Sequence, residues 1–266
     1  MERKQKIYLG TNTKMYKTIA QTKTFLTELA QLTSDIPRDK LELFVIPSFT
    51  TLEAARKCVP TELITLGAQN MGWEDEGQFT GEISPLMLRE VGMQIVEIGH
   101  SERRHVLGET DEQEMLKLRC ALRHGFTPLL CVGETARQKE LGITDEVLRT
   151  QLKIALHGVQ LDKKLWVAYE PVWAIGVSGT PASKEYADEK HKVIRQALVE
   201  IMGSMGEEVP ILYGGSVNEQ NASELIEMPN VDGLFIGRSA WQAEGFNSII
   251  RNVMPLFFAR RAREAL

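Results

Sequence analysis

Glu170 is a candidate general base, because the residues around it predict a rigid backbone at its position. It follows the short apolar run Trp166-Val167-Ala168-Tyr169, which is typical of a strand buried on both faces. Pro171 comes next, and a proline fixes its own φ while restraining the residue before it. We therefore predict that Glu170 sits on a stiff strand end, in a position to take a proton from a bound substrate.

The segment after Pro171 has the composition of a lid. Apolar side chains occupy residues 172–175, and Gly176 and Gly179 follow them. A polar loop needs no such residues, whereas a segment that closes over a site and excludes water does. The alternative is a fixed connector whose Trp173 packs on the core.

His100, Lys14, Asn12 and Glu102 complete the candidate catalytic set. His100 precedes Ser101-Glu102, a predicted helix start, and the positive end of a helix favours a neutral imidazole that donates a hydrogen bond to a carbonyl. Lys14 and Asn12 offer a cation and a donor near an oxyanion, and Glu102 is placed to orient a neighbour. The alternatives are a core histidine and solvated surface residues. Structural roles are expected for the other histidines, His105, His124, His157 and His191.

Two short glycine-containing turns predict a phosphate site. They read Gly214-Gly215-Ser216 and Gly237-Arg238-Ser239, and each leads toward a predicted helix. Glycine lets the backbone approach a ligand, and helix N-termini direct N–H groups at anions. The chain contains neither Gly-x-x-x-x-Gly-Lys-Ser/Thr nor Gly-x-Gly-x-x-Gly, which argues against a nucleotide cofactor.

Together these groups suit proton abstraction next to the carbonyl of a small phosphorylated ketose or aldose. They supply a base, a neutral electrophile, a cation, a phosphate cradle and a lid that protects an enediolate from water. A catalytically silent barrel that binds a phosphate ligand or a protein is one alternative. A metal-dependent aldolase is another, but no His-rich or carboxylate cluster has ligand spacing, so we expect no metal.

Strand-like and helix-like stretches alternate about eight times along the chain. This alternation predicts parallel strands with helical crossovers, and eight such units close into a single (β/α)8 barrel spanning residues 1–266. A doubly wound open sheet is the alternative. The predicted strands are residues 6–9, 42–46, 63–68, 95–98, 128–132, 165–169, 210–213 and 233–236, and the predicted helices are residues 18–32, 51–57, 84–91, 109–124, 144–156, 183–202, 218–226 and 246–263.

The composition limits the partners. Hydrophobic residues at 43% and charged residues at 25% are ordinary for a globular protein. The net charge of −5 argues against nucleic acid and anionic membranes as partners. Cys58, Cys120 and Cys131 have no metal-type spacing and fit a reducing cytoplasm. The charged start predicts no signal peptide, and no apolar run approaches the roughly 18 residues of a membrane span.

The chain resembles the triosephosphate isomerase family nearly from end to end. The motifs that carry this resemblance are Asn12-Thr13-Lys14, Gly67-Ala68-Gln69-Asn70, Phe79-Thr80-Gly81-Glu82-Ile83-Ser84, Ile98-Gly99-His100-Ser101-Glu102-Arg103-Arg104, Ala168-Tyr169-Glu170-Pro171-Val172-Trp173-Ala174-Ile175-Gly176 and Tyr213-Gly214-Gly215-Ser216-Val217. The resemblance implies a (β/α)8 barrel and an isomerase without a cofactor.

The resemblance also assigns roles by motif position. Glu170 corresponds to the base, His100 to the neutral electrophile and Lys14 to the cation, and this family is itself a well-known example of a Glu base paired with a neutral His. Asn12 and Glu102 correspond to supporting residues. Gly176, Ser216, Gly237 and Arg238 are implied to hold the phosphate through backbone amides, with Asn12 and Lys14 also contacting the substrate.

Departures from the family pattern bear on the substrate. Thr13 replaces the usual aromatic residue, and Arg238 replaces the second phosphate-binding glycine. The lid continues as Gly176-Val177-Ser178-Gly179 in place of the usual Gly-Lys-Thr type of segment. The lid and Arg238 are similar to those of the erythrulose-phosphate isomerase branch, which acts in erythritol breakdown and interconverts L-erythrulose 1-phosphate and D-erythrulose 4-phosphate. The alternative is interconversion of dihydroxyacetone phosphate and glyceraldehyde 3-phosphate, as in glycolysis and gluconeogenesis.

The resemblance further implies a homodimer. Residues 69–77 fall where the family projects its third loop into a partner subunit. The alternative is a surface loop in which Trp73 packs locally.

Overall fold

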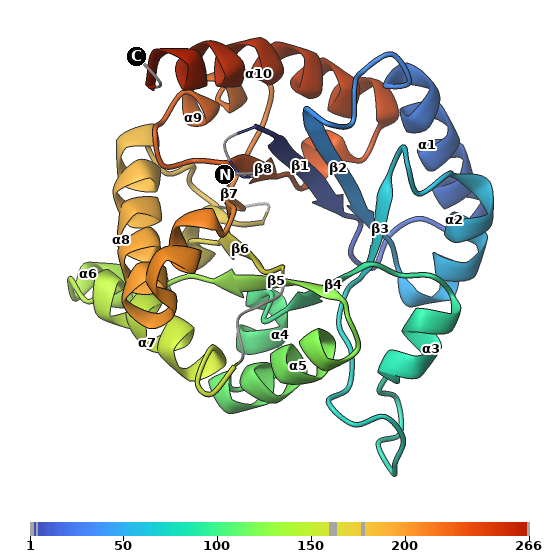
Figure 1. The fold of residues 1–266 in the computed structure, drawn as a ribbon, viewed down its shortest axis with the longest axis horizontal. Coiled ribbons are helices and arrows are strands. Elements are labelled where there is room, and N and C mark those ends of the chain that lie inside the picture. The colour runs from blue at the N-terminus through green and yellow to red at the C-terminus, as the bar shows by residue number, and fades with distance from the viewer. Residues whose placement is uncertain (1–2, 4, 160–163, 177–178, 265–266) are drawn as a thin grey trace.

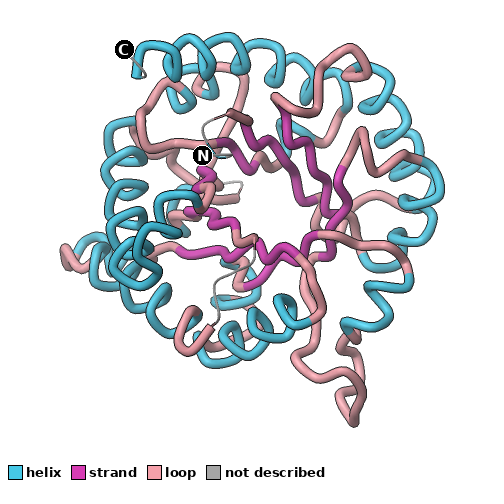
Figure 2. The backbone as a smooth tube through the Cα atoms, viewed as in Figure 1, coloured by secondary structure: helices cyan, strands magenta, loops and turns pink. Residues whose placement is uncertain are grey.

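Eight parallel strands close into a barrel in the order of the chain (Figure 1). The computed structural model describes residue 3 and residues 5–159, 164–176 and 179–264. Figure 2 shows the strands as a central ring enclosed by helices. The strands are β1 (Ile7–Asn12), β2 (Leu41–Ile46), β3 (Thr65–Ala68), β4 (Ile95–Ile98), β5 (Thr127–Val132), β6 (Trp166–Tyr169), β7 (Ile211–Tyr213) and β8 (Gly233–Phe235).

Helices cover the outside of the barrel and cross over between successive strands. Side chains that accept from backbone N–H groups begin several of them: Thr18 and Thr110 form capping boxes, and Ser183 caps its helix as predicted. The helices are α1 (Ile19–Leu32), α2 (Leu52–Cys58), α3 (Pro85–Glu90), α4 (Ser101–His105), α5 (Asp111–Arg123), α6 (Ala136–Glu140), α7 (Thr144–Ala155), α8 (Lys184–Met202), α9 (Ala222–Ile226) and α10 (Ala243–Glu264).

The pairing of β1 with β8 closes the barrel and excludes the open doubly wound sheet. Tyr8 and Gly233 are partners in this parallel pair. A Cβ atom on Gly233 would lie 2.0 Å from the carbonyl oxygen of Tyr8, so the two strands approach too closely for any larger residue.

The inside of the barrel is packed with side chains that alternate along each strand. Successive strand residues point to opposite faces, so one face of each strand packs inward and the other packs against the helices. The inward-facing apolar residues form a cluster of their own, made of Tyr8, Phe44, Ile46, Ile95, Leu129, Cys131, Trp166, Ala168, Leu212 and Phe235. The same alternation places Asn12 and Glu97 on the inner face, nearer the carboxyl ends of their strands.

The predicted boundaries were wrong at two places that matter for the site. β1 continues to Asn12 although the apolar residues stop at Leu9, because Thr11 and Asn12 pair with Val45 and Ile46 of β2. Asn12 is therefore a strand residue and not a loop residue.

The second boundary is the start of α9, predicted at residue 218. The helix begins at Ala222, and the side chain of Asn218 instead accepts hydrogen bonds from the backbone N–H groups of Gln220 and Asn221. Such local side-chain bonds offer the backbone an alternative to a helix. The segment after β7 is consequently a turn.

The segment between β3 and α3 extends away from the barrel (Figure 1). Within it, Trp73 contacts Phe79 edge to face, with ring centroids 5.7 Å apart. None of the helices in the described part of the chain has both the length and the apolar character needed to cross a membrane.

Candidate active site

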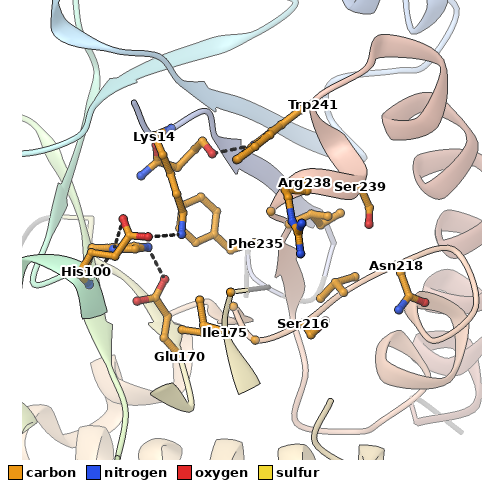
Figure 3. A pocket seen from close by; sticks show the side chains of 18 of the residues that line it. Lys14, His100, Glu170, Ile175, Ser216, Asn218, Phe235, Arg238, Ser239 and Trp241 are labelled. Atoms are coloured by element: carbon orange, nitrogen blue, oxygen red, sulfur yellow. Dashed lines mark hydrogen bonds and ion pairs between the residues drawn. The ribbon is translucent and has the colours of Figure 1, made fainter. Parts of the chain in front are cut away.

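A cavity of about 570 Å³ opens at the carboxyl ends of the strands. This end of a (β/α)8 barrel carries the active site in characterised enzymes of the fold, because the loops after all eight strands meet there. All nine residues predicted for the site line this one cavity: Asn12, Lys14, His100, Glu102, Glu170, Gly176, Ser216, Gly237 and Arg238. Figure 3 shows Lys14, His100 and Glu170 on one side and Ser216, Arg238 and Ser239 on the other.

Glu170 is held at both its backbone and its side chain. Its backbone N–H donates to the carbonyl of Val132 at 2.7 Å, and its Oε2 accepts from the backbone N–H of Ser101 at 3.1 Å. The second carboxylate oxygen lies 3.5 Å from Nε2 of His100. The neighbouring strand end packs against the same peptide, since a Cβ on Gly133 would lie 1.9 Å from the carbonyl oxygen of Glu170. The carboxylate is thus buried and immobilised at the mouth of the barrel.

His100 is the N-cap of α4, as the sequence predicts. Its Nδ1 accepts a hydrogen bond from the backbone N–H of Glu102 at 3.1 Å. A nitrogen that accepts cannot also carry a proton, so this contact puts the proton of the neutral ring on Nε2. Nε2 is the atom that faces Glu170 and the cavity (Figure 3).

Lys14 has a backbone conformation that a lysine rarely adopts. Its φ is +52°, in the left-handed region, and its backbone N–H donates to Oδ1 of Asn12 at 2.6 Å. Its Nζ lies 2.7 Å from Oε1 of Glu102. Strained residues cluster at functional sites, where surrounding contacts hold them in place. Here the conformation directs the ammonium group along the cavity wall, next to His100.

Glu97 also lies beside the candidate site, and it was not predicted from the sequence as a site residue. Its side chain is fully buried, and its Oε2 accepts from Nδ2 of Asn12 at 2.6 Å. Burial raises the pKa of Glu97 well above its usual value, and the nearby Glu170 carboxylate raises the pKa further. The available signal was the charged residue within the apolar run Ile95-Val96-Glu97-Ile98.

Glu97, His100 and Glu170 each bring one polar atom within 4.8 Å of the others, a proximity that sequence spacing did not reveal. Three such groups can in principle surround an ion. A carboxylate that coordinates an ion cannot at the same time accept a proton from carbon, so a bound ion here would compete with the predicted role of Glu170 as a base.

The predicted lid starts with a short 3₁₀ helix, Val172–Ala174. Nε1 of Trp173 donates to the buried carboxylate of Glu134 at 2.7 Å, and the ammonium of Lys139 lies 3.3 Å from the centre of the Trp173 ring. Beyond it, Ile175 and Gly176 line the cavity. The central lid residues Val177 and Ser178 lie outside the described residues, so closure of the lid stays a prediction.

The predicted phosphate side of the cavity combines two turns. Ser216 does not sit at a helix N-terminus, contrary to the prediction, because the Asn218 turn separates it from α9. The second turn does enter a short 3₁₀ helix, Arg238–Ala240. The Arg238 side chain points into the cavity in Figure 3. Further cavity residues not predicted from the sequence include Tyr16, Asn218, Phe235 and Trp241.

The other histidines lie away from this cavity in the described part of the chain. His191 is a core histidine, as expected for a histidine with a structural role. It is fully buried, and desolvation lowers its pKa to about 4. His105, His124 and His157 lie at or just beyond the ends of helices.

Comparison with known proteins agrees with this geometry. The family model described as triosephosphate isomerase matches residues 7–253. A protein of Rhizobium etli named L-erythrulose-1-phosphate isomerase is 48% identical over 93% of this chain and 92% of its own length. Proteins of the same name from Rhizobium meliloti and Mesorhizobium japonicum are 46% and 47% identical, over 94% and 91% of this chain and 98% and 95% of their own lengths. This chain therefore belongs to the triosephosphate isomerase family.

Proposed function

We propose that this protein is a sugar-phosphate isomerase that interconverts L-erythrulose 1-phosphate and D-erythrulose 4-phosphate. The observation that carries the proposal is the approach of Glu170 to within 3.5 Å of His100 Nε2 in a cavity that also contains Lys14. The names of the relatives, at 46–48% identity in three organisms, support the choice of a four-carbon substrate.

The chemistry moves a ketone between the two middle carbons of the sugar. Glu170 removes the proton from C3, and the electron pair of that C–H bond forms the C2–C3 double bond of an enediolate. The Nε2–H of His100 and the ammonium of Lys14 stabilise the negative charge that develops on the C2 oxygen. His100 gives its Nε2 proton to the C2 oxygen and takes the proton of the C3 hydroxyl, so the negative charge moves from the C2 oxygen to the C3 oxygen. Glu170 then returns the proton taken from C3 to C2, and the C3 oxygen becomes the carbonyl. Substrate and product have the same atoms and oxidation level, so these groups require no redox cofactor.

The phosphate is proposed to lie across the cavity from the base. Gly176, Ser216 and Gly237 line the same cavity and offer backbone amides to an anion, and Arg238 offers a cation. The net charge of the protein is −5, so capture of an anionic substrate depends on these local groups and Lys14.

A direct comparison of kcat/KM on L-erythrulose 1-phosphate and dihydroxyacetone phosphate tests the substrate. We expect the tetrulose phosphate to be preferred about tenfold, because a hydrogen bond to the additional hydroxyl group contributes about 1 kcal/mol. Preference for the triose phosphate would instead support a triosephosphate isomerase.

Arg238→Gly tests the phosphate site in the same assay. We expect KM to rise about tenfold for both substrates, because a charge-assisted contact to phosphate is lost. An unchanged KM for both would show that the guanidinium does not contact the phosphate.

Exhaustive chelation tests the metal-dependent alternative. We expect kcat/KM to be the same before and after treatment with EDTA, because Glu170, His100 and Lys14 supply the base, the electrophile and the cation. Loss of activity that returns on adding a divalent cation would support an aldolase-type mechanism.

We also propose a homodimer formed through the projecting segment of residues 69–77. Its neighbourhood exposes apolar side chains, with Phe79 44% and Met87 60% exposed, around a second cavity of about 340 Å³. The local packing of Trp73 on Phe79 is compatible with either interpretation of the segment. A monomeric mass in sedimentation equilibrium would contradict the dimer. The free thiols of Cys58, Cys120 and Cys131 support a cytoplasmic location.

A further inference from the structure

Glu97 is a buried carboxyl beside the reacting groups that the mechanism above does not use. It lies on the inner face of β4, two residues after Ile95, and its side chain has no exposure to solvent. One of its oxygens is within 4.8 Å of a nitrogen of His100 and an oxygen of Glu170. An apolar residue would fill this part of the barrel at a lower desolvation cost, so we expect the carboxyl group to have a specific role.

The contacts of Asn12 show what Glu97 holds in place. Oδ1 of Asn12 accepts from the backbone N–H of Lys14 at 2.6 Å and from Nε2 of Gln69 at 2.9 Å. Nδ2 of Asn12 donates to Oε2 of Glu97 at 2.6 Å. These three contacts assign the amide orientation, since a flipped amide would place donors against donors. An amide nitrogen carries two hydrogens, so one N–H remains available to a ligand in the cavity that Asn12 lines.

The surroundings of Glu97 favour its neutral form. The charged groups that act on it are the carboxylates of Glu170 and Glu102 and the ammonium of Lys14. Sγ of Cys131, on β5, approaches Oε1 of Glu97 at 3.8 Å. Burial is the largest cause that raises the pKa of Glu97, and the Glu170 carboxylate comes next. A neutral carboxyl can accept from Asn12 without placing a second negative charge behind the base.

We propose that Glu97 is a positioning residue of the isomerase site: its neutral carboxyl holds the Asn12 amide so that one N–H faces the substrate oxygen. The inference rests on the proposed function. It assigns to Glu97 a task that depends on shape and hydrogen bonding, and not on transfer of its own proton. When Glu97 ionises, the added negative charge opposes formation of the enediolate and of the Glu170 carboxylate.

Two substitutions separate this role from general packing. Glu97→Leu removes the acceptor for Asn12 and is expected to lower kcat about 30–100-fold, with KM changed less than about threefold, because a misoriented donor acts mainly on the transition state. Glu97→Gln keeps one acceptor and one donor and is expected to lower kcat only about threefold. Ile95→Val, on the same strand and face, is the control for loss of packing.

The pH dependence provides a readout that a packing role would not change. In the unsubstituted enzyme, kcat is expected to fall at alkaline pH as Glu97 loses its proton. In Glu97→Gln this fall is expected to move to higher pH, because the group that ionises is absent. Infrared spectroscopy checks the charge state without turnover: the carbonyl band of protonated Glu97 is expected at neutral pH in the difference spectrum between the unsubstituted protein and Glu97→Gln. The difference is needed because burial also raises the pKa of Glu114, to about 7.

Several outcomes would overturn the inference. If Glu97→Gln is as damaging as Glu97→Leu, the residue acts through its proton or charge and not as a neutral acceptor. If Glu97→Leu keeps its activity, or if the alkaline limb is the same in all variants, Glu97 does not position Asn12. A protein that turns over neither sugar phosphate would refute the proposed function instead, and the absence of the infrared band would then still refute a neutral Glu97.

Discussion

Replacing Glu170 by Asp is expected to lower kcat about 10²–10³-fold, because the carboxylate retreats by one methylene and a misplacement of about 1 Å can cost 10²-fold. The surrounding structure prevents the backbone from shifting to compensate for the shorter side chain. The Glu170 backbone is bonded to Val132 and packed against Gly133, so it cannot advance to restore the reach of the shorter side chain. Steady-state kinetics on L-erythrulose 1-phosphate measures the effect.

Binding of inorganic phosphate should be unchanged in Glu170→Asp, because Glu170 is not among the residues proposed to bind the phosphate. Calorimetric titration with phosphate checks this point. Glu90→Asp, at the exposed end of α3, is the matched control and is expected to keep its kcat. Turnover that survives in Glu170→Asp at near the original rate would favour a barrel that binds phosphate without using Glu170 as a base.

Lys14→Met should reduce kcat/KM at least about 10³-fold, because removing one group that stabilises an oxyanion typically costs 10²–10³-fold and the anionic substrate also loses a cation. Methionine preserves most of the side-chain length. It is a non-glycine residue like lysine, so the cost of the left-handed backbone at position 14 stays similar. The effect therefore reports the charge. Measuring kcat and KM separately shows how it divides between chemistry and binding.

Lys57→Met is the control for Lys14→Met. Lys57 is an exposed lysine that also pairs with a glutamate, Glu53, but it lies on the outer helix α2. We expect its kcat/KM to remain unchanged. If Lys14→Met retained more than about a tenth of the original kcat/KM, Lys14 would contribute little more than a surface ion pair of roughly 1 kcal/mol or less.

The sequence predicted that the site residues meet in one place, because the geometry of a (β/α)8 barrel brings them together. Glu170, His100 and Ser216 are far apart in the chain, yet each follows a strand-like run. In parallel strands with helical crossovers, all such positions meet at one end. Residue type and position after a strand were therefore sufficient to predict that these three residues share one cavity, without any contact information.

Glu97 was not predictable by the same reasoning, because it lies within a strand and not after one. The run Ile95-Val96-Glu97-Ile98 does not say which face points into the barrel, and only the closed barrel shows that Glu97 shares the inner face with Ile95. Barrel closure itself also escapes sequence periodicity. It depends on a contact between β1 and β8 across more than two hundred residues, which a local pattern cannot contain.

Local polar contacts explain the remaining differences. Asn12 extends β1 beyond its apolar residues because its side chain is satisfied by Glu97, Lys14 and Gln69, so a polar residue could stay in a buried strand. Asn218 delays α9 by bonding to the backbone of its own turn. Both residues shift the boundary of an element through their hydrogen-bond partners, and the sequence alone does not identify those partners.

The tight contact at Gly133 has a consequence for how this enzyme can diversify. Gly133 does not line the cavity among the described residues, yet any side chain there would collide with the peptide that carries Glu170. Exchanges at Arg238 or Ser216 alter what enters the mouth while leaving the reaction centre intact. Substrate preference can therefore change by substitution at the rim, whereas a side chain at position 133 would displace the base itself, so variants with altered specificity are expected to keep this glycine.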